Sequence, residues 1–494
     1  MSAQTVDERT YGGWTRPRRE GMWGMGWTVS IAAFAAVVIA LLVVMVVGLK
    51  AAAVVVVIEL AVLAPLAHSR GGRTGYERAL LMTNWWRTLL RRENIYLAGI
   101  FSRLGTCKLP GLMATSKLYE STDAAGYRFA MIHMPGHHAY TVLLRCWPQG
   151  ARAVDQDRID AWVAAWSGLL VTVGEKPDVE ALTVVVDTLP ETGNRLAAEV
   201  NALTRADAPE PARVMMAQLA AQLPVETVRM ESWLSVTFKA TTPARRKDPA
   251  EQAEEVARRL PLITAALAEA GVRARPMTGE EAIALLRRAW DPASEADLEA
   301  VAENGESHEL SWDDAGPIFH DEKYDRLLHD GVVSVSWEMD LPPEGVVREK
   351  VLQRLLAPSD QLIRKRVAIV YRPHSAGDAA QIVDGDYKDA LVAEQTERGV
   401  GSATAVMRVR ATEAAREEQA RGHGVTRFGA LITVTEPAGA DLPALEAITK
   451  DLSSQARLRI RRCYRYQAAA FSACLGAGAL LPQMASLPRV VSES

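Results

Sequence analysis

The chain has 494 residues, and its 56 lysines and arginines against 60 aspartates and glutamates give a formal net charge of −4. No stripe of basic residues interleaved with aromatics occurs in its later part, so direct DNA or RNA binding is not expected. The cysteines at positions 107, 146, 463 and 474 are scattered and form no CxxC pair. This spacing argues against a disulfide framework or a thiolate metal site and indicates reduced thiols in a cytoplasmic compartment.

A polar arm of residues 1–26 precedes two apolar runs over residues 27–67. The first run, residues 27–49, has about twenty apolar residues without a charge, enough to cross a hydrocarbon core of roughly 30 Å. Lys50 separates it from the second run. A cleavable signal peptide has a shorter apolar centre and no second run, and a pair of soluble core helices rarely has apolar stretches of this length. We therefore expect a two-helix transmembrane hairpin.

Basic residues flank this hairpin on both sides. Up to residue 120 there are 14 lysines and arginines against 7 acids, whereas the remainder has 42 against 53. By the positive-inside tendency both chain ends lie in the cytoplasm and only the turn at Lys50 faces outward. Glu59, inside the second helix, costs about 3 kcal/mol on insertion scales, so we expect it to face another helix or a partner subunit. The flanking arginines are Arg16, Arg18, Arg19, Arg70, Arg73 and Arg78.

Residues 68–117 form a basic membrane-proximal segment. Within it, residues 74–94 place leucines and a tryptophan on one helical face and arginines on the other. This pattern fits an interfacial helix on the inner leaflet or a helix packed on the following domain, and the sequence does not decide between them.

Residues 118–290 read as a first α+β domain in the order β-β-α-β-α-α-β-α-β-α, with a capping box of Thr278 and Glu281 before its last helix. Residues 291–325 are acidic and punctuated by proline and glycine, so they are taken as a linker. Residues 326–494 repeat a β-α-β-α-β-α-β rhythm. The predicted fold class is α+β, with two related and ferredoxin-like cytoplasmic halves. A charged helix over 387–421 is either a solvated arm or a projecting partner contact.

The sequence offers no catalytic constellation. It lacks a phosphate-binding G-x-x-x-x-G-K-[ST] loop, an H-E-x-x-H pair and a G-x-S-x-G elbow. His133, His137 and His138 surround a predicted hairpin turn without the spacing of a further metal ligand, and the acidic pairs at 313–314 and 321–322 lack the pattern of a calcium loop. No enzyme activity, cofactor or metal is expected.

Four stretches together resemble a known family. They are the hairpin at 27–67, the strand beginning GVV at 331, the block KRVAIVYRP at 365–373 and the ending YQAAAFSACLG at 466–476. The chain resembles actinobacterial integral membrane proteins of conjugation, or type IV-like secretion, gene clusters. In that family a PrgI-like inner-membrane hairpin is joined to the membrane-binding domain of a conjugation ATPase, without the motor domain.

This resemblance implies a non-enzymatic inner-membrane subunit that acts as an oligomer within a channel complex and recruits a separate secretion ATPase. The C-terminal region 458–488, which contains Tyr466, Phe471 and Leu475, is then expected to dock that ATPase. A second resemblance, to EccE-like components of type VII secretion, shares the two N-terminal helices but has no match to the ending at 466–476. A membrane-bound enzyme would need a catalytic cluster that the sequence lacks.

Overall fold

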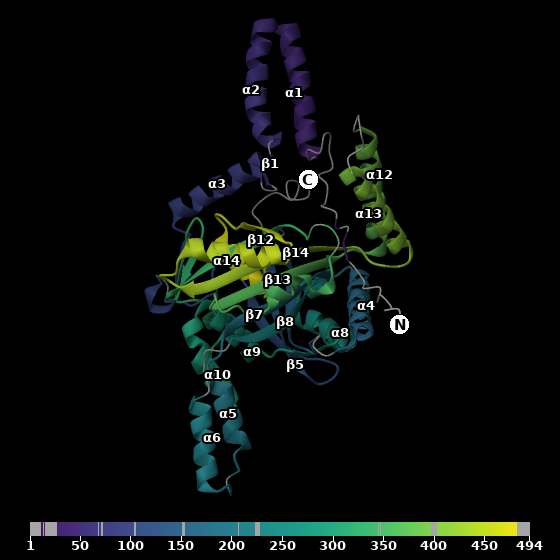
Figure 1. Cartoon of the computed structure of the whole chain (residues 1–494). Helices are drawn as coiled ribbons and strands as arrows, with labels where there is room; N and C mark the ends of the chain where they lie inside the picture. Colours follow the sequence, from purple (N-terminus) through teal and green to yellow (C-terminus); the bar gives the residue numbers. More distant parts are fainter. Residues whose placement is uncertain are drawn as a thin grey trace. The chain divides into compact units, whose positions relative to one another are not determined.

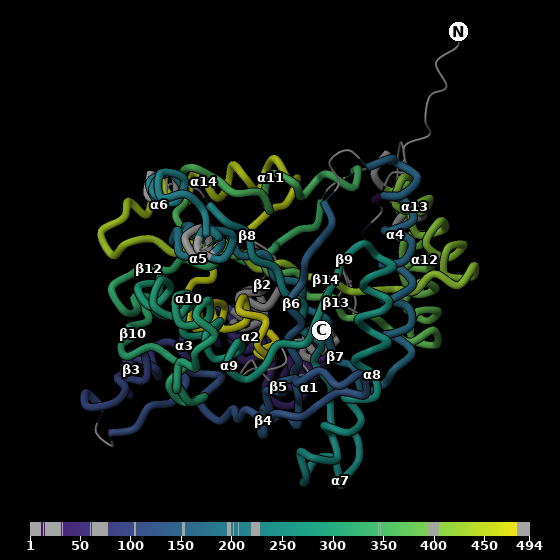
Figure 2. The backbone as a smooth tube through the Cα atoms, turned by 90° about the horizontal axis from the view of Figure 1, so that it is seen from below, coloured from purple at the N-terminus to yellow at the C-terminus, as the bar shows by residue number. Residues whose placement is uncertain are grey.

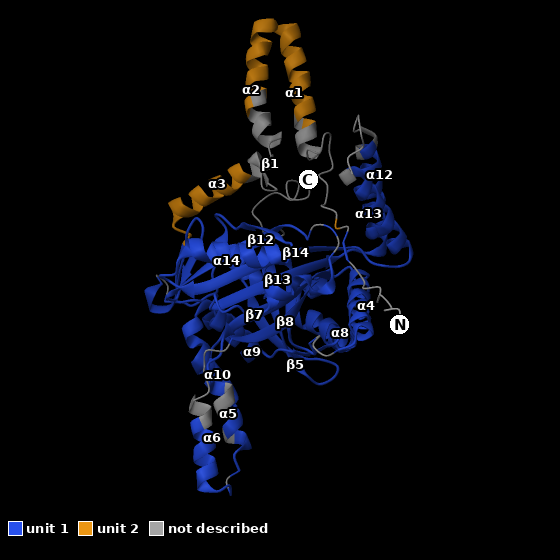
Figure 3. Ribbon diagram, viewed as in Figure 1, with its two compact units in different colours: residues 1–13, 95–479 blue, residues 14–94, 480–494 orange. Residues whose placement is uncertain are grey.

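The computed structural model describes residues 11–12, 14, 27–67, 69–70, 73–102, 105–150, 154–205, 207–222, 228–343, 345, 347–396 and 403–481. The chain separates into two compact units (Figure 3). One comprises residues 14–94 with 480–494, and the other residues 1–13 with 95–479.

The smaller unit begins with two helices, α1 (Trp27–Val46) and α2 (Leu49–Ala67), which lie side by side as an antiparallel hairpin (Figure 1). The chain reverses at Gly48, whose φ of +108° favours a residue without a Cβ atom. The two helices therefore occur where the apolar runs predict them. A short ribbon of β1 (Ser69–Arg70) and β2 (Arg73–Thr74) leads into α3 (Gly75–Arg91). Within the part of the chain that the structure describes, no helix combines the length and apolarity needed to cross a membrane.

In the larger unit, thirteen strands of the described residues form one antiparallel sheet. Its order is β3-β10-β11-β12-β14-β13-β7-β8-β6-β5-β4, with β15 beside β12 and β9 beside β6. The strands are β3 (Ile95–Leu97), β4 (Lys117–Thr122), β5 (Arg128–Met134), β6 (Ala139–Pro148), β7 (Val179–Pro190), β8 (Val228–Lys239), β9 (Val272–Pro276), β10 (Phe319–Glu322), β11 (Leu327–His329), β12 (Val332–Leu341), β13 (Arg364–Pro373), β14 (Thr426–Pro437) and β15 (Arg459–Arg462).

Helices connect these strands and cover both faces of the sheet (Figures 1 and 2). The α+β class predicted from the sequence is confirmed, as is the capping box that starts α9. The helices of this unit are α4 (Gln156–Gly174), α5 (Asn194–Leu203), α6 (Glu210–Gln222), α7 (Pro243–Lys247), α8 (Pro249–Glu269), α9 (Gly279–Trp290), α10 (Glu295–Glu303), α11 (Gln353–Leu356), α12 (Ala376–Thr396), α13 (Ala403–Ala420), α14 (Leu442–Gln455) and α15 (Gln467–Cys474).

The same strand order occurs twice in the sheet. β6, β7, β8 and β9 take the order β9-β6-β8-β7, and β12, β13, β14 and β15 take the order β15-β12-β14-β13. The two sets meet where β7 pairs with β13, and Val185 lies opposite Ala368. Each of these residues lies five positions before the proline that ends its strand, Pro190 or Pro373, so the two sets are related by an approximate two-fold rotation.

A repeated hydrogen bond supports this relation. The hydroxyls of Thr141 and Thr237 lie 3.0 Å apart between β6 and β8, and those of Ser334 and Thr435 lie 2.7 Å apart between β12 and β14. In each case the first residue is third in its strand and the second is third from the end. The two sets thus share side-chain detail as well as topology.

Each set also has a helical insertion at the same place. Helices α5 and α6 connect β7 to β8, and α12 and α13 connect β13 to β14 (Figure 1). The charged tract expected to be helical over 387–421 is therefore part of a pair of helices that begins earlier, at Ala376. From the sequence, Gly399 and Gly401 are expected to break this tract, and they lie in residues 397–402, outside the described residues.

The tract at 291–325, predicted to link two domains, contains α10 and β10. β10 pairs with β3 on one side and β11 on the other. Strands before and after this tract share one sheet, and residues 95–479 belong to one compact unit.

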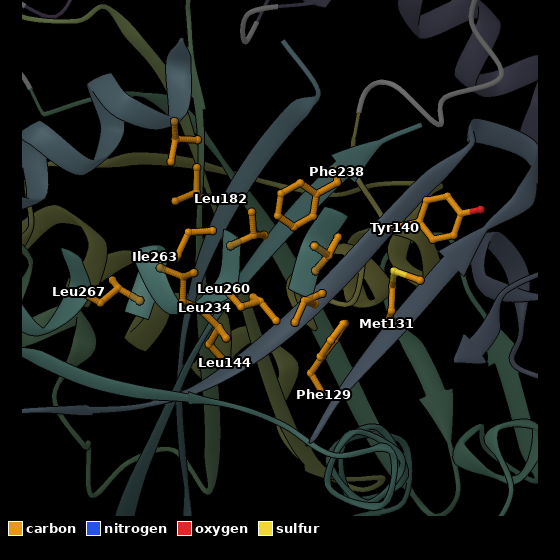
Figure 4. Close-up of a cluster of buried hydrophobic side chains, with 14 of the residues drawn as sticks. Phe129, Met131, Tyr140, Leu144, Leu182, Leu234, Phe238, Leu260, Ile263 and Leu267 are labelled. Carbon is orange, nitrogen blue, oxygen red and sulfur yellow. The ribbon is translucent and has the colours of Figure 1, made fainter. Parts of the chain in front are cut away.

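One face of the sheet carries the apolar cores. Under α4 and α8, side chains of β5, β6, β7 and β8 pack with Leu260, Ile263 and Leu267 of α8 (Figure 4). A second cluster, which includes Val367 and Trp337, lies under α11 and α14. Each of these large apolar side chains contributes about 1.5–3 kcal/mol on burial. Because alternate strand residues point to opposite faces, Arg364, Arg366 and Ala368 lie on the other face of β13.

Candidate functional site

The second face of the sheet carries buried charges. Asp187 of β7 is 1 % exposed and lies opposite Arg366 of β13. Its Oδ2 accepts hydrogen bonds of 2.8 Å from the Nη2 atoms of both Arg364 and Arg366. Burial alone would raise the pKa of this carboxyl, but the two guanidinium groups hold the pKa below its ordinary value. Asp187 is therefore ionised and doubly paired across the junction of the two sets of strands.

The ion pairs continue toward α9 and α10. Arg229 of β8 donates to Glu295 and Glu299, and Arg288 of α9 donates to Glu295 at 2.6 Å. Glu231 lies 3.3 Å from both arginines. We call this set the ion cluster; it has five carboxylates against four guanidinium groups. Its members are Asp187, Glu191, Glu231, Glu295, Glu299, Arg229, Arg288, Arg364 and Arg366.

A cavity of about 260 Å³ adjoins the ion cluster. Ala293 and Ala296 at its edge are exposed, whereas Arg364 and Thr435 are buried, so it leads from the surface to the charged face of the sheet. Most of its lining is apolar, but two acidic residues contribute. The lining residues are Leu189, Pro190, Thr192, Pro292, Ala293, Glu295, Ala296, Val332, Ile363, Arg364, Thr435, Glu436 and Pro437.

Both acidic residues have unused hydrogen-bonding capacity. Glu436 is 9 % exposed, and Ile363 N donates to its Oε1 at 2.7 Å, which is the one hydrogen bond that its side chain makes with the described part of the chain. Burial raises the pKa of this carboxyl. Glu295 Oε1 accepts from two arginines, while its Oε2 is buried without a hydrogen-bond partner, 3.8 Å from Arg364 Nη1. The cavity therefore offers acceptors rather than donors.

Sequence reasoning missed the ion cluster because its members come mainly from five elements separated by up to about 180 positions in the chain. A partial signal was present. In β8, Arg229 and Glu231 alternate with residues of the opposite face, and β13 begins with three basic residues, 364–366, before its apolar run. Alternating charges within a buried strand indicate a charged sheet face, but they do not identify the partners.

The apolar hairpin leaves most of its large side chains uncovered. The less exposed positions include small residues, which allow two helices to approach closely; they are Ala33, Ala36 and Ala40 of α1 and Ala51 and Ala52 of α2. The exposed large apolar residues of the two helices are Ile31, Phe34, Val37, Val38, Ile39, Leu41, Leu42, Val44, Met45, Val46, Leu49, Val54, Val56, Val57 and Ile58.

The polar residues singled out around this hairpin are only partly described. Lys50 is exposed beside the turn at Gly48, and Glu59 is half-buried, with its Oε1 buried and without a hydrogen-bond partner among the described residues. Arg78 is half-buried on α3. The backbones of Arg70 and Arg73 pair in the β1–β2 ribbon, but their side chains lie outside the described part. Arg16, Arg18 and Arg19 lie wholly outside it.

The C-terminal segment expected to dock a partner lies across the charged face of the sheet. Phe471 is fully buried with its ring 4.4 Å from that of Trp290, and Leu475 is 1 % exposed. Tyr466 is half-buried. In this arrangement Phe471 and Leu475 belong to the core, because the sheet and α9 enclose them, and neither side chain is accessible to a partner.

We call residues 466–479 the C-terminal strap. At its start the Gln467 side chain accepts a hydrogen bond from Ser336 N at 2.8 Å and donates one to Ser336 O at 3.2 Å. Farther on, Trp233 Nε1 donates to Leu475 O at 3.0 Å. Ser336 lies on β12 and Trp233 on β8, so the strap fastens strands from both repeated sets.

The three histidines do not form one site. His133 is buried, with its ring 4.1 Å from that of Tyr140 and parallel to it. Burial, followed by the charge of His138, lowers the pKa of His133 to about 4. His137 and His138 are exposed at the hairpin turn. Among the described residues, no three or more histidines, cysteines or acids are grouped so as to hold a metal ion.

A family model matches the N-terminal part of the chain. This family model is described as a domain of unknown function, DUF8461, and matches residues 18–77. That segment includes the apolar hairpin and the ribbon that follows it. No curated protein matches the chain.

Proposed function

We propose that the protein is a non-enzymatic, membrane-anchored structural subunit, and that α1 and α2 form its transmembrane hairpin. The supporting observation is the exposed apolar surface of these helices. Burying one such side chain contributes about 1.5–3 kcal/mol, so ten of them amount to at least about 15 kcal/mol. This free energy exceeds the net stability of most domains, so the apolar surface of these helices must be buried in an apolar environment. The hydrocarbon core of a bilayer provides that environment for an antiparallel pair of apolar helices.

In this proposal both chain ends are cytoplasmic and Lys50 faces outward. Helix α3 then lies on the inner leaflet, because its exposed Met82, Trp86 and Leu90 recur every four residues and form a stripe. The arginines around the hairpin face anionic headgroups. The unpartnered oxygen of Glu59 suits a polar contact with a second copy or a partner helix.

The cellular role that we propose is a component of a conjugation or type IV-like secretion apparatus in the inner membrane, which anchors and recruits a separate ATPase. The support comes from the resemblance of the stretches at 27–67, 331–341, 365–373 and 466–476. The β-α-β-β-α-β order of each repeated set also suits two ferredoxin-like halves. Since Phe471 and Leu475 are buried, we assign recruitment of the ATPase to other side chains of the surface.

The test is a pull-down of the tagged full-length protein from detergent-solubilised membranes of its own cell, read by mass spectrometry. Recovery of a conjugation-type ATPase with channel subunits is the expected result. Recovery of type VII core components instead would favour the EccE-like alternative. A monomer that carries a small molecule and no protein partner would contradict the scaffold role. Deleting residues 458–488 is not a clean test, because it removes core side chains.

A further inference from the structure

The cavity beside the ion cluster is the best-formed candidate for a second function. It opens at Ala293 and Ala296 and ends at the charged sheet face, between the ends of β7, β12, β13 and β14. Its volume of about 260 Å³ is large enough for one long side chain or a small organic ion. Its walls of proline, leucine, valine and isoleucine suit an aliphatic stem.

The unused polar groups of the cavity are anionic. Glu436 and Glu295 are each at least nine-tenths buried, and each has a carboxylate oxygen without a hydrogen bond from the described residues. The third charged lining residue, Arg364, is already occupied. It donates to Asp187 through Nε and Nη2 and to Arg288 O through Nη1.

Charge balance favours the same ligand class. The ion cluster has five carboxylates and four guanidinium groups, and Glu436 adds a sixth carboxylate that has no ion-pair partner in the described chain. A buried carboxylate without a counter-charge is costly, and a cationic donor relieves that cost. An anionic ligand would meet two carboxylates and no free donor.

We propose that this cavity binds an aliphatic cation, an ammonium or guanidinium group on an apolar stem, with the head at Glu436 and Glu295 and the stem along Ile363 and Leu189. The same chemistry occurs in the lysine or arginine side chain of a partner protein and in a free alkylamine. A charge-assisted hydrogen bond to a buried carboxylate is among the stronger polar contacts, so Glu436 is expected to dominate selectivity.

The experiment is isothermal titration of the purified full-length protein with two probes, butylammonium chloride and a capped glycine peptide carrying one lysine. 1-Butanol serves as the uncharged control. Glu436→Gln removes the charge but keeps the acceptor for Ile363 N, and it is expected to weaken binding at least tenfold. Ala296→Phe obstructs the opening without altering the charge, and it is expected to weaken binding by a similar factor. Glu303→Gln removes an exposed carboxylate of the same helix and is expected to change nothing.

The two probes separate the sources of the cation. Tighter binding of the peptide supports a partner side chain, and binding of butylammonium alone supports a free amine; both results support the cation site. The inference is overturned if neither probe binds saturably, if 1-butanol binds as well as butylammonium, or if Glu436→Gln leaves the affinity unchanged.

Discussion

Gly478 gives a sharp test of how the C-terminal strap is held. Its φ is +94°, and a Cβ atom there would lie 2.7 Å from Thr141 Oγ1 and 3.3 Å from Thr141 Cβ. Thr141 cannot retreat easily, because it is fully buried and its hydroxyl is bonded to that of Thr237. Gly478→Ala therefore combines an unfavourable backbone conformation with a clash against the sheet.

Gly422 supplies a matched control. Its φ is +95°, nearly that of Gly478, but no atom lies within 4 Å of where its Cβ would be. Gly422→Ala should cost only the backbone term, about 1–2 kcal/mol. Overpacking a buried site adds about 1–3 kcal/mol, so Gly478→Ala should destabilise by about 2–5 kcal/mol in total. The difference between the two variants isolates the packing of the strap.

The assay is urea unfolding of the detergent-purified full-length protein, followed by tryptophan fluorescence. Trp233 donates to the strap, so its environment reports release of that segment. We expect a clearly lower unfolding midpoint for Gly478→Ala than for Gly422→Ala. Equal midpoints would refute the reasoning, because they would mean that residue 478 does not press on the sheet.

Three further variants test the charged face of the sheet by the same unfolding assay. Trp233→Phe removes the donor to Leu475 O and should cost about 1–3 kcal/mol at all pH values; an unchanged midpoint would contradict the hydrogen bond. Asp187→Asn leaves two buried guanidinium groups without their counter-charge and should cost about 3–5 kcal/mol. Because the pKa of Asp187 is lowered, its contribution to the free energy of unfolding is present above pH 3.8 and is lost as the pH falls through the lowered pKa. The Asn variant should lack this loss of stability in acid. Burial raises the pKa of Glu322 to about 7. Its contribution to the free energy of unfolding is therefore fully present below pH 4.5 and is lost as the pH rises through about 7. Glu322→Gln should therefore gain stability relative to the wild type as the pH rises from about 4.5 to about 7, and an identical pH profile would count against the buried carboxyl.

Much of the fold is local and could be predicted from the sequence. Apolar runs placed α1 and α2, alternation and a turn placed β5 and β6, and Thr278 with Glu281 placed the start of α9. These features depend on neighbours a few positions apart. The local pattern is therefore sufficient to predict them.

The long-range features could not be predicted in the same way. Pairing of β7 with β13 joins positions about 180 residues apart, and nothing in either strand alone specifies that register. Two acids of the tract at 291–325, Glu295 and Glu299, belong to the ion cluster, although acids between two periodic regions usually indicate a solvated linker. Phe471 and Leu475 lie in a segment rich in small residues, which permits close contact with the sheet.

The central claim, that α1 and α2 cross a membrane with Lys50 outside, is tested most directly by thiol labelling in intact cells. Lys50→Cys introduces a thiol at the turn, and the native, half-buried Cys107 serves as the internal control on the cytoplasmic side. A membrane-impermeant maleimide should label residue 50 in intact cells and Cys107 only after permeabilisation. Labelling of residue 50 only after permeabilisation would contradict the account. Recovery of the protein in the soluble fraction of lysed cells, and not with the membranes, would contradict it as well.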